Sequence, residues 1–295
     1  MDKEKQFIFQ VDSPDVLKVF DTNNYCIEYN RSADCDSNLC VIYFSSNDIY
    51  YPNTLKSFEY SIIERDKYEW KKNRISTAKK HIFIRDIRKQ WYIGGINSEL
   101  DTPIKLAEFL KKETTSYKVY TIGSSAGGFA AILFGSLLKV NRIYAFNAQL
   151  NLSVTMQSSN SSIDPILFNK VNDDKEKLYF DLSNFITDSV DYYYFQSCRS
   201  DMDIVHYENI STIAKNRIKI IRFKTSNHGF PFLRINLPYI FAFDKNSLDS
   251  LVDKTFNPIH FSIRLIGLTA TIKFVIKAIV DLLKKKRNQA SLKSK

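Results

Sequence analysis

Short apolar runs alternate with amphipathic segments along most of the chain. Apolar residues at helical spacing predict helices from Pro103 to about Lys112, after Ser125 and from Ile204 to Ala214. Runs rich in β-branched and aromatic residues predict strands at 39–44, 81–87, 119–122, 142–146, 192–196 and 218–224. Strands that alternate with helices are typical of a parallel sheet covered on both faces, so the pattern predicts an α/β fold.

Three segments depart from this rhythm. Residues 5–11 and 17–29 are predicted as early strands, the second with a turn signal at Asn23 and Asn24. Residues 147–188, with their Ser-Ser-Asn-Ser-Ser run, interrupt the regular order as an insertion. The division expected from these patterns is a body of residues 1–255 and an appendage of residues 256–295.

Glycine is concentrated around one serine. The chain has eight glycines, and Gly123 and Gly127 flank Ser125 at two positions on either side. An apolar strand precedes this motif and an apolar helix follows it, which is the layout of a nucleophile elbow. Glycines suit the crowded backbone of such a turn, and the helix N-terminus favours a developing oxyanion. The motif predicts Ser125 as a nucleophile.

A serine nucleophile needs a base, and the chain has four histidines. His81 lies in a predicted strand and His206 in a predicted helix, while His260 lies near the start of a C-terminal helix. His228 instead follows the predicted strand 218–224 closely, in a polar loop. Loops at the carboxyl ends of strands are where an open α/β sheet collects its site, so His228 is the predicted base.

The orienting acid is expected between Ser125 and His228 in chain order. Asp201 and Asp203 both lie in the loop after the predicted strand 192–196. Asp203 also precedes a predicted helix, where an aspartate can act as an N-cap. The residues themselves leave both candidates open.

An oxyanion hole needs two N–H donors. The N–H of Ala126, directly after the nucleophile, is the first. The second is expected in the loop after the predicted strand 39–44, at Ser45 or Ser46, although the glycine run of lipases is absent there.

Charge is distributed unevenly. The net charge is +10, and residues 256–295 contain nine Lys or Arg residues against the single acid Asp281, which leaves residues 1–255 at only +2. The body shows no interleaving of basic and aromatic residues, so a nucleic-acid partner is not expected. The four cysteines include no C-x-x-C pair, so no metal site is expected either.

The basic appendage is also apolar. Its longest uncharged run, Leu265–Ile272, is far shorter than the roughly 20 residues that span a bilayer. Lys273, Lys277 and Asp281 recur every four residues, on one face of a helix. Residues 261–287 are therefore expected either to lie on an anionic membrane surface or to pack on the body as a final helix. The N-terminus lacks the apolar core of a signal peptide, which predicts a cytoplasmic protein.

The Ser, Asp, His order resembles the α/β-hydrolase superfamily over residues 38–240. More narrowly, residues 123–135 (GSSAGGFAAILFG) and 142–149 (RIYAFNAQ) resemble hydrolase-fold proteins of bacterial capsule and surface-glycan clusters, including polysaccharide O-acetyltransferases. In such proteins a histidine often follows the acid by three residues, as His206 follows Asp203, and this favours Asp203. The resemblance also implies that residues 147–188 form a cap over the site.

This resemblance implies an acetyl transfer through Ser125 from acetyl-CoA to a hydroxyl of a capsular polysaccharide, with no tightly bound cofactor. Assembly of surface glycans at the inner membrane face would suit a peripheral location there. With water as acceptor, the same residues would make a serine esterase or deacetylase. A non-catalytic glycan-assembly or scaffold protein that retains the fold is the third interpretation.

Overall fold

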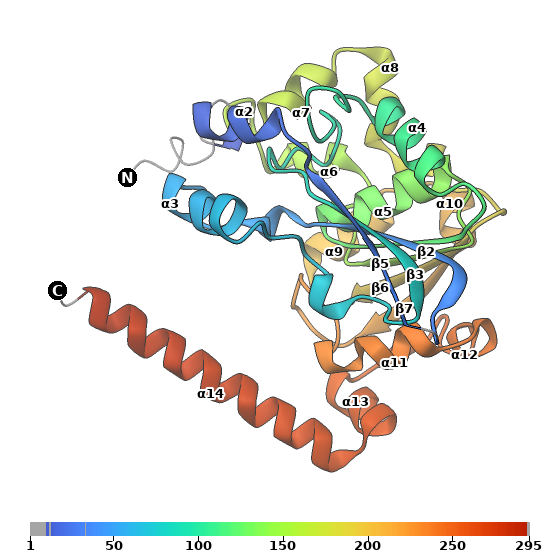
Figure 1. Ribbon diagram of the computed structural model, residues 1–295. Coiled ribbons are helices and arrows are strands. Elements are labelled where there is room, and N and C mark those ends of the chain that lie inside the picture. Colours follow the sequence, from blue (N-terminus) through green and yellow to red (C-terminus); the bar gives the residue numbers. More distant parts are fainter. Residues whose placement is uncertain (1–9, 12, 33, 294–295) are drawn as a thin grey trace.

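The computed structural model describes residues 10–11, 13–32 and 34–293, with the backbone alone at 282 and 285–293. Within these residues an eight-stranded sheet has the order β1-β3-β2-β4-β5-β6-β7-β8 (Figure 1). Only β1 is antiparallel to its neighbour. The strands are β1 Tyr25–Tyr29, β2 Asp36–Phe44, β3 Ala78–Ile84, β4 Lys118–Ser124, β5 Arg142–Phe146, β6 Asp191–Ser197, β7 Ile218–Phe223 and β8 Thr255–Phe256. The predicted mostly parallel α/β sheet is confirmed.

Strand β2 shows why the apolar runs are continuous. Successive side chains point to opposite faces of a sheet, and both faces are covered here. Alternate residues therefore enter two different cores. Cys40, Ile42 and Phe44 belong to one core, and Leu39, Val41 and Tyr43 belong to the other.

Helices cover both faces of the sheet (Figure 1). The face of Phe44 packs against α4 Pro103–Glu113, α5 Ala126–Leu137, α6 Leu152–Gln157, α7 Pro165–Lys170, α9 Asp201–Glu208 and α10 Thr212–Arg217. The opposite face packs against α11 Leu237–Ala242, α12 Lys245–Asp249 and α13 Pro258–Ile266. The remaining helices are α2 Pro14–Phe20, α3 Leu55–Phe58, α8 Asp174–Lys177 and α14 Leu268–Lys293, with short turns η1 Asn47–Ile49, η2 Glu59–Glu64, η3 Lys71–Asn73, η4 Leu178–Phe180, η5 Leu182–Asn184 and η6 Arg234–Asn236.

The predicted early strands are wrong over most of their described length. Residues 5–9 lie outside the described residues, and residues 10–11 are helical. Residues 17–20 belong to α2, and the first strand begins only at Tyr25. Pro14 at the first helical position favours a helix, and Val16 and Phe20 are four residues apart, so both are buried on its inner face.

Two predicted boundaries also differ. The single helix predicted from Ile204 to Ala214 is divided into α9 and α10, because the Ser211 side chain accepts the N–H of Ala214 and starts a second helix. Strand β3 ends at Ile84 rather than at residue 87. The Asp86 carboxylate accepts backbone N–H groups from four following residues and turns the chain.

The C-terminal appendage consists of α13 and α14. Gly267, with φ 84°, ends α13 in a conformation that favours glycine, and α14 leaves in a new direction. Among the side chains that the structure describes, those in the first turns of α14 contact the body: Thr271 is buried and its hydroxyl lies 3.1 Å from that of Ser262. The rest of α14 projects away from the body (Figure 1). Within the described part of the chain, no helix has the length and apolarity to cross a membrane.

Candidate active site

Ser125 lies on a sharp turn between β4 and α5. Its φ of 54° and ψ of −123° are unusual for a non-glycine residue, and such strain is concentrated at functional sites. The neighbouring glycines are required because there is no room for a side chain at either position. A Cβ on Gly123 would lie 1.9 Å from the Gly127 carbonyl oxygen, and one on Gly127 would lie 2.4 Å from the Phe44 carbonyl oxygen. The motif therefore forms the tight strand-turn-helix that its sequence predicts.

Three predicted residues form one hydrogen-bonded chain. Ser125 Oγ lies 2.8 Å from His228 Nε2, and His228 Nδ1 lies 2.7 Å from Asp203 Oδ1. They come from the ends of β4, β7 and β6, which meet at one edge of the parallel sheet. The buried aspartate favours a proton on Nδ1, which leaves Nε2 free to accept the serine proton.

The structure distinguishes the two candidate acids. Both lie in the first turn of α9, where Asp201 is exposed and Asp203 is completely buried. Residues two positions apart along a helix differ by about 200° in direction, so only one of this pair can face His228. Asp203 is the one in contact. Asp201 has no contact with the histidine.

His206 packs behind this chain without joining it. It is buried, and its Nδ1 accepts the backbone N–H of Asn151 at 3.4 Å. Burial, together with the nearby His228, lowers the pKa of His206 to about 4, so this histidine is neutral at physiological pH.

Asn147, which the sequence analysis did not single out, holds the histidine loop. Its side-chain Nδ2 donates to the carbonyl oxygens of Asn227 at 3.0 Å and His228 at 2.7 Å, and its Oδ1 accepts the N–H of Ser197 at 2.7 Å. The residue is fully buried and has φ 43°, a region that asparagine tolerates. Its position directly after β5, at the sheet edge that contains the site, was the available signal.

The two amides expected as the second oxyanion donor already have acceptors. The N–H of Ser45 donates to the Ile84 carbonyl oxygen at 3.0 Å. The N–H of Ser46 donates to Glu69 Oε2 at 2.8 Å, and its hydroxyl donates to the other oxygen of the same carboxylate. Both predicted amides are thus engaged. The N–H of Ala126, in the first turn of α5, has no partner within its helix and stays a predicted donor.

A glutamine missed by the sequence analysis lies beside the nucleophile. Gln149 Oε1 accepts the indole N–H of Trp91 at 2.7 Å and lies 3.4 Å from Ser125 Oγ. It lies three residues after the end of β5, in the segment that Asn147 begins. Its carboxamide is a polar group fixed against the reacting oxygen.

Ser125 and His228 line a cleft of about 1080 Å³. Its walls come from residues 46–48, 65–73 and 227–234, with Phe274 of α14. No residue from 150–188 lines it. The helices of that segment instead extend the layer beside α5, so the predicted cap over the site is not supported.

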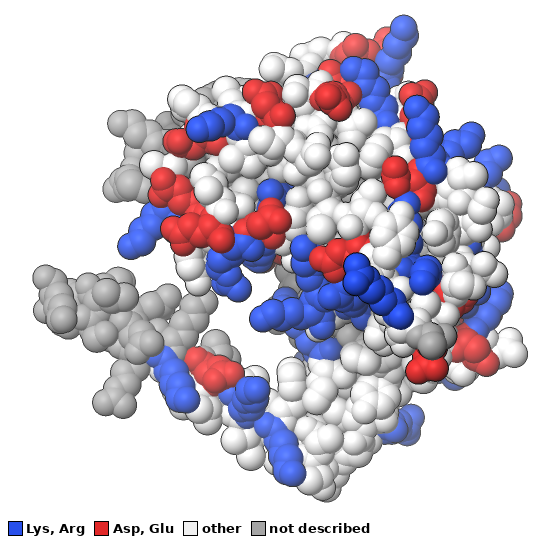
Figure 2. Space-filling view, viewed as in Figure 1, with Lys and Arg blue, Asp and Glu red and all other residues white. Residues whose placement is uncertain are grey.

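The cleft contains more cations than anions. Arg65, Lys72 and Arg234 are exposed there, and among the described residues none of them forms an ion pair. Of the three acidic residues that line it, Asp66 pairs with Arg85, Glu69 is engaged by Ser46, and Asp48 is exposed. Figure 2 shows Lys and Arg side chains gathered around the hollow between α14 and the body.

The order and geometry define a class of protein. An elbow serine after β4, a buried aspartate after β6 and a histidine after β7 are the site of an α/β-hydrolase-like protein. This constellation is used for acyl transfer and ester hydrolysis.

No protein-family model and no curated protein matches the sequence. Among solved structures, the capsule O-acetyltransferase of Neisseria meningitidis serogroup A is 18% identical, with a TM-score of 0.47 over 68% of this chain and 82% of that chain. Esterase B from Lactobacillus rhamnosis is 10% identical, with a TM-score of 0.43 over 92% and 91%. Acetyl xylan esterase 1 from a Thermoanaerobacterium species is 11% identical, with a TM-score of 0.42 over 77% and 78%. These structural similarities do not identify a reaction for this chain.

Proposed function

We propose that this protein is a serine acyltransferase that moves an acetyl group from acetyl-CoA, through Ser125, to a hydroxyl of a surface polysaccharide. The observation that carries the proposal is the continuous chain from Ser125 Oγ through His228 to the buried Asp203, opening into a cationic cleft. The polysaccharide acceptor rests on the resemblance of residues 123–149 to capsule-cluster proteins.

In the first step His228 Nε2 takes the proton of Ser125 while Oγ forms a bond to the acetyl carbon. The thioester C–S bond breaks, and the coenzyme A thiolate leaves with the proton from His228. In the second step an acceptor hydroxyl gives its proton to His228 and takes the acetyl group. The Oγ–acyl bond breaks, and His228 returns the proton to Ser125.

The charge of the cleft fits the donor. Coenzyme A carries several phosphate groups, and guanidinium and ammonium groups are their usual partners in proteins. Arg65, Lys72 and Arg234 supply such groups without an acidic partner of their own. A donor with its phosphates on these cations could direct its thioester toward Ser125 in the same cleft.

The test is to incubate the protein with acetyl-CoA, with and without candidate glycans, and to measure released thiol and acetylated glycan. Glycan-dependent release that is lost in Ser125→Ala supports transfer. Ester or thioester hydrolysis that no glycan alters would assign the site to an esterase. A serine-directed fluorophosphonate that labels neither wild type nor Ser125→Ala, or both equally, would support the non-catalytic scaffold instead.

A further inference from the structure

The outer face of α14 is apolar and has no partner within the described structure. Its large side chains there are 41–62% exposed: Leu268, Ile272, Ile276, Ile279, Val280 and Leu283. At 3.6 residues per turn these positions fall within an arc of about 120°, so they form one continuous stripe. Thr271 and Phe274 point the other way, toward α13 and the cleft.

Cations border this stripe. Lys273, Lys277 and Lys284 lie next to it on the helix, and Lys285, Lys286 and Arg287 follow in the sequence. Lysines at the edge of an apolar face can extend their ammonium groups to an anionic surface while the face itself is buried. Figure 2 shows Lys and acidic side chains in a row along the described part of α14.

The positive charge of the appendage also indicates which partner would cover the apolar stripe. A second copy of the chain would bring two strongly cationic appendages together, since residues 256–295 carry nine basic residues and one acid. Anionic lipids would attract the same appendage. We infer that α14 is an interfacial membrane helix, which buries its apolar stripe in an anionic bilayer surface and lies parallel to it.

The position of the helix connects this surface to the cleft. Phe274 lines the cleft from one side of α14 while the stripe occupies the other side. The cleft mouth would then lie about one helix diameter, roughly 10 Å, from the lipid surface. A substrate held at the membrane would be concentrated next to Ser125. The membrane inference itself does not depend on the proposed reaction.

The test is flotation of the full chain with vesicles of phosphatidylglycerol and phosphatidylcholine, compared with phosphatidylcholine alone. Wild type is expected to float with the anionic vesicles, less so as salt is raised. Ile276→Glu and Ile279→Glu should each lower the partition coefficient about tenfold, because they place a carboxylate in the apolar stripe. Ala278→Glu adds the same charge on an exposed position outside the stripe and should bind like wild type.

Labelling of Ser125 by a fluorophosphonate shows whether each variant retains a folded site. Variants that label normally but do not float establish the membrane role of the stripe. Wild type that does not float, or equal binding of Ile279→Glu and wild type, overturns the inference. If wild type does not bind vesicles but forms a dimer by light scattering, and Ile279→Glu dissociates this dimer, the stripe binds a second copy of the chain instead. Absence of labelling in wild type would count against the proposed reaction and leave the flotation result intact.

Discussion

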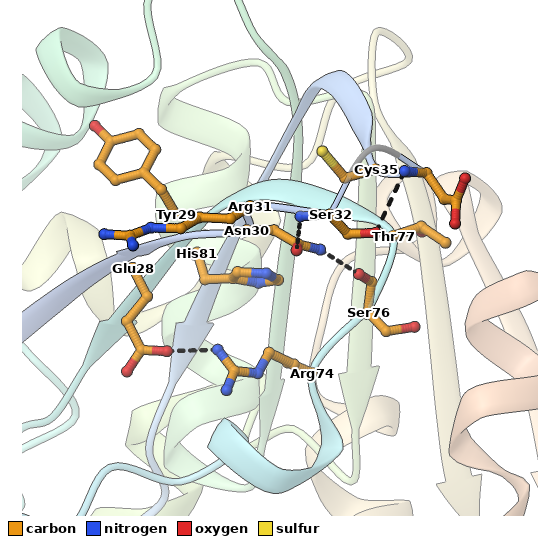
Figure 3. A pocket seen from close by; sticks show the side chains of 11 residues that line it. Glu28, Tyr29, Asn30, Arg31, Ser32, Cys35, Arg74, Ser76, Thr77 and His81 are labelled. Carbon is orange, nitrogen blue, oxygen red and sulfur yellow. Dashed lines mark hydrogen bonds and ion pairs between the residues drawn. The ribbon is translucent and has the colours of Figure 1, made fainter.

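Hollows at opposite ends of the sheet each contain a histidine. His228 lines the cleft of about 1080 Å³ at the carboxyl ends of the parallel strands. His81, on β3, lines a hollow of about 700 Å³ at the other end, with Glu28, Arg74 and serines nearby (Figure 3). Both hollows therefore hold the residue types of a catalytic site.

The difference lies in how these residues are connected. His228 is bonded on one side to Ser125 and on the other to the buried Asp203. His81 Nδ1 faces the hydroxyl of Tyr43, while Glu28 is paired with Lys71 and Arg74. A histidine acts as a base in acyl transfer when one ring nitrogen contacts the nucleophile and the other contacts an acid. A position beside a hollow is not sufficient.

The largest expected difference between the two hollows appears when each histidine is exchanged for glutamine. His228→Gln removes the base that accepts the Ser125 proton, so hydrolysis of a small acetyl ester should fall by about 10⁴ to 10⁶-fold. His81→Gln should change this rate no more than about threefold, since His81 has no contact with the nucleophile. Equal losses in the two variants, both folded by circular dichroism, would show that the two hollows are not functionally different.

The second prediction concerns Asp203, the acid that orients His228. Asp203→Asn keeps the shape but allows the wrong tautomer of His228, and a loss of about 10⁴-fold in kcat is the scale for such a change. The matched variant Asp201→Asn alters the exposed neighbour and should keep nearly full activity. A larger loss in Asp201→Asn than in Asp203→Asn would contradict the hydrogen-bonded chain described for the site.

The third prediction concerns the contribution of His81 to the stability of the fold. Burial lowers the pKa of His81 to about 4, below the ordinary value near 6.5 expected in the unfolded chain. Between these values the unfolded state binds the proton and the folded state does not, so stability is complete above about pH 6.5 and falls as the pH drops toward 4. The expected loss from His81 is about 3 kcal/mol at pH 4, with His206 contributing in the same direction.

Denaturant unfolding across this pH range measures that slope. His81→Gln should make the fall in the free energy of unfolding shallower, whatever its effect at neutral pH. His260→Gln is the matched control, because it makes the same change at an exposed histidine. A His81→Gln slope as steep as that of wild type would mean that this histidine is not held neutral by the fold.

The sequence predicted those parts of the site that depend on local constraints. Ser125 was recognisable because the elbow needs glycines two residues away, and His228 because it closely follows a strand. The choice between Asp201 and Asp203 needed the helix that begins at Asp201, since the direction of each side chain follows from it. The amide of Ser46, one of the two candidates for the second oxyanion donor, is bonded to Glu69, which is 23 residues away in the chain. No local sequence pattern predicts such a long-range contact.

The fold was predictable for a similar reason. Central strands such as β2 are buried on both faces, so their apolar runs are unambiguous. Three of residues 17–20 are apolar as well, and the burial of α2 against α3 and residues 49–50 is a long-range contact that favours their helix over a strand. The segment 147–188 was expected over the site by resemblance, whereas its own leucines and aromatics pack beside α5.

The smallest expected effect is at Asn147, a positioning residue that acts through His228. Asn147→Ala removes the side-chain donations to the loop carbonyls, so the loop should hold His228 less firmly against Ser125. We expect kcat to fall about tenfold with KM little changed, and the rate of fluorophosphonate labelling to fall by the same factor. Asn151→Ala is the matched control: it also removes a hydrogen bond to a backbone carbonyl, that of Asn209, but touches no part of the histidine loop. If both variants lost stability equally and both kept their labelling rate, Asn147 would be only a structural residue, and the orientation of His228 would depend on Asp203 alone.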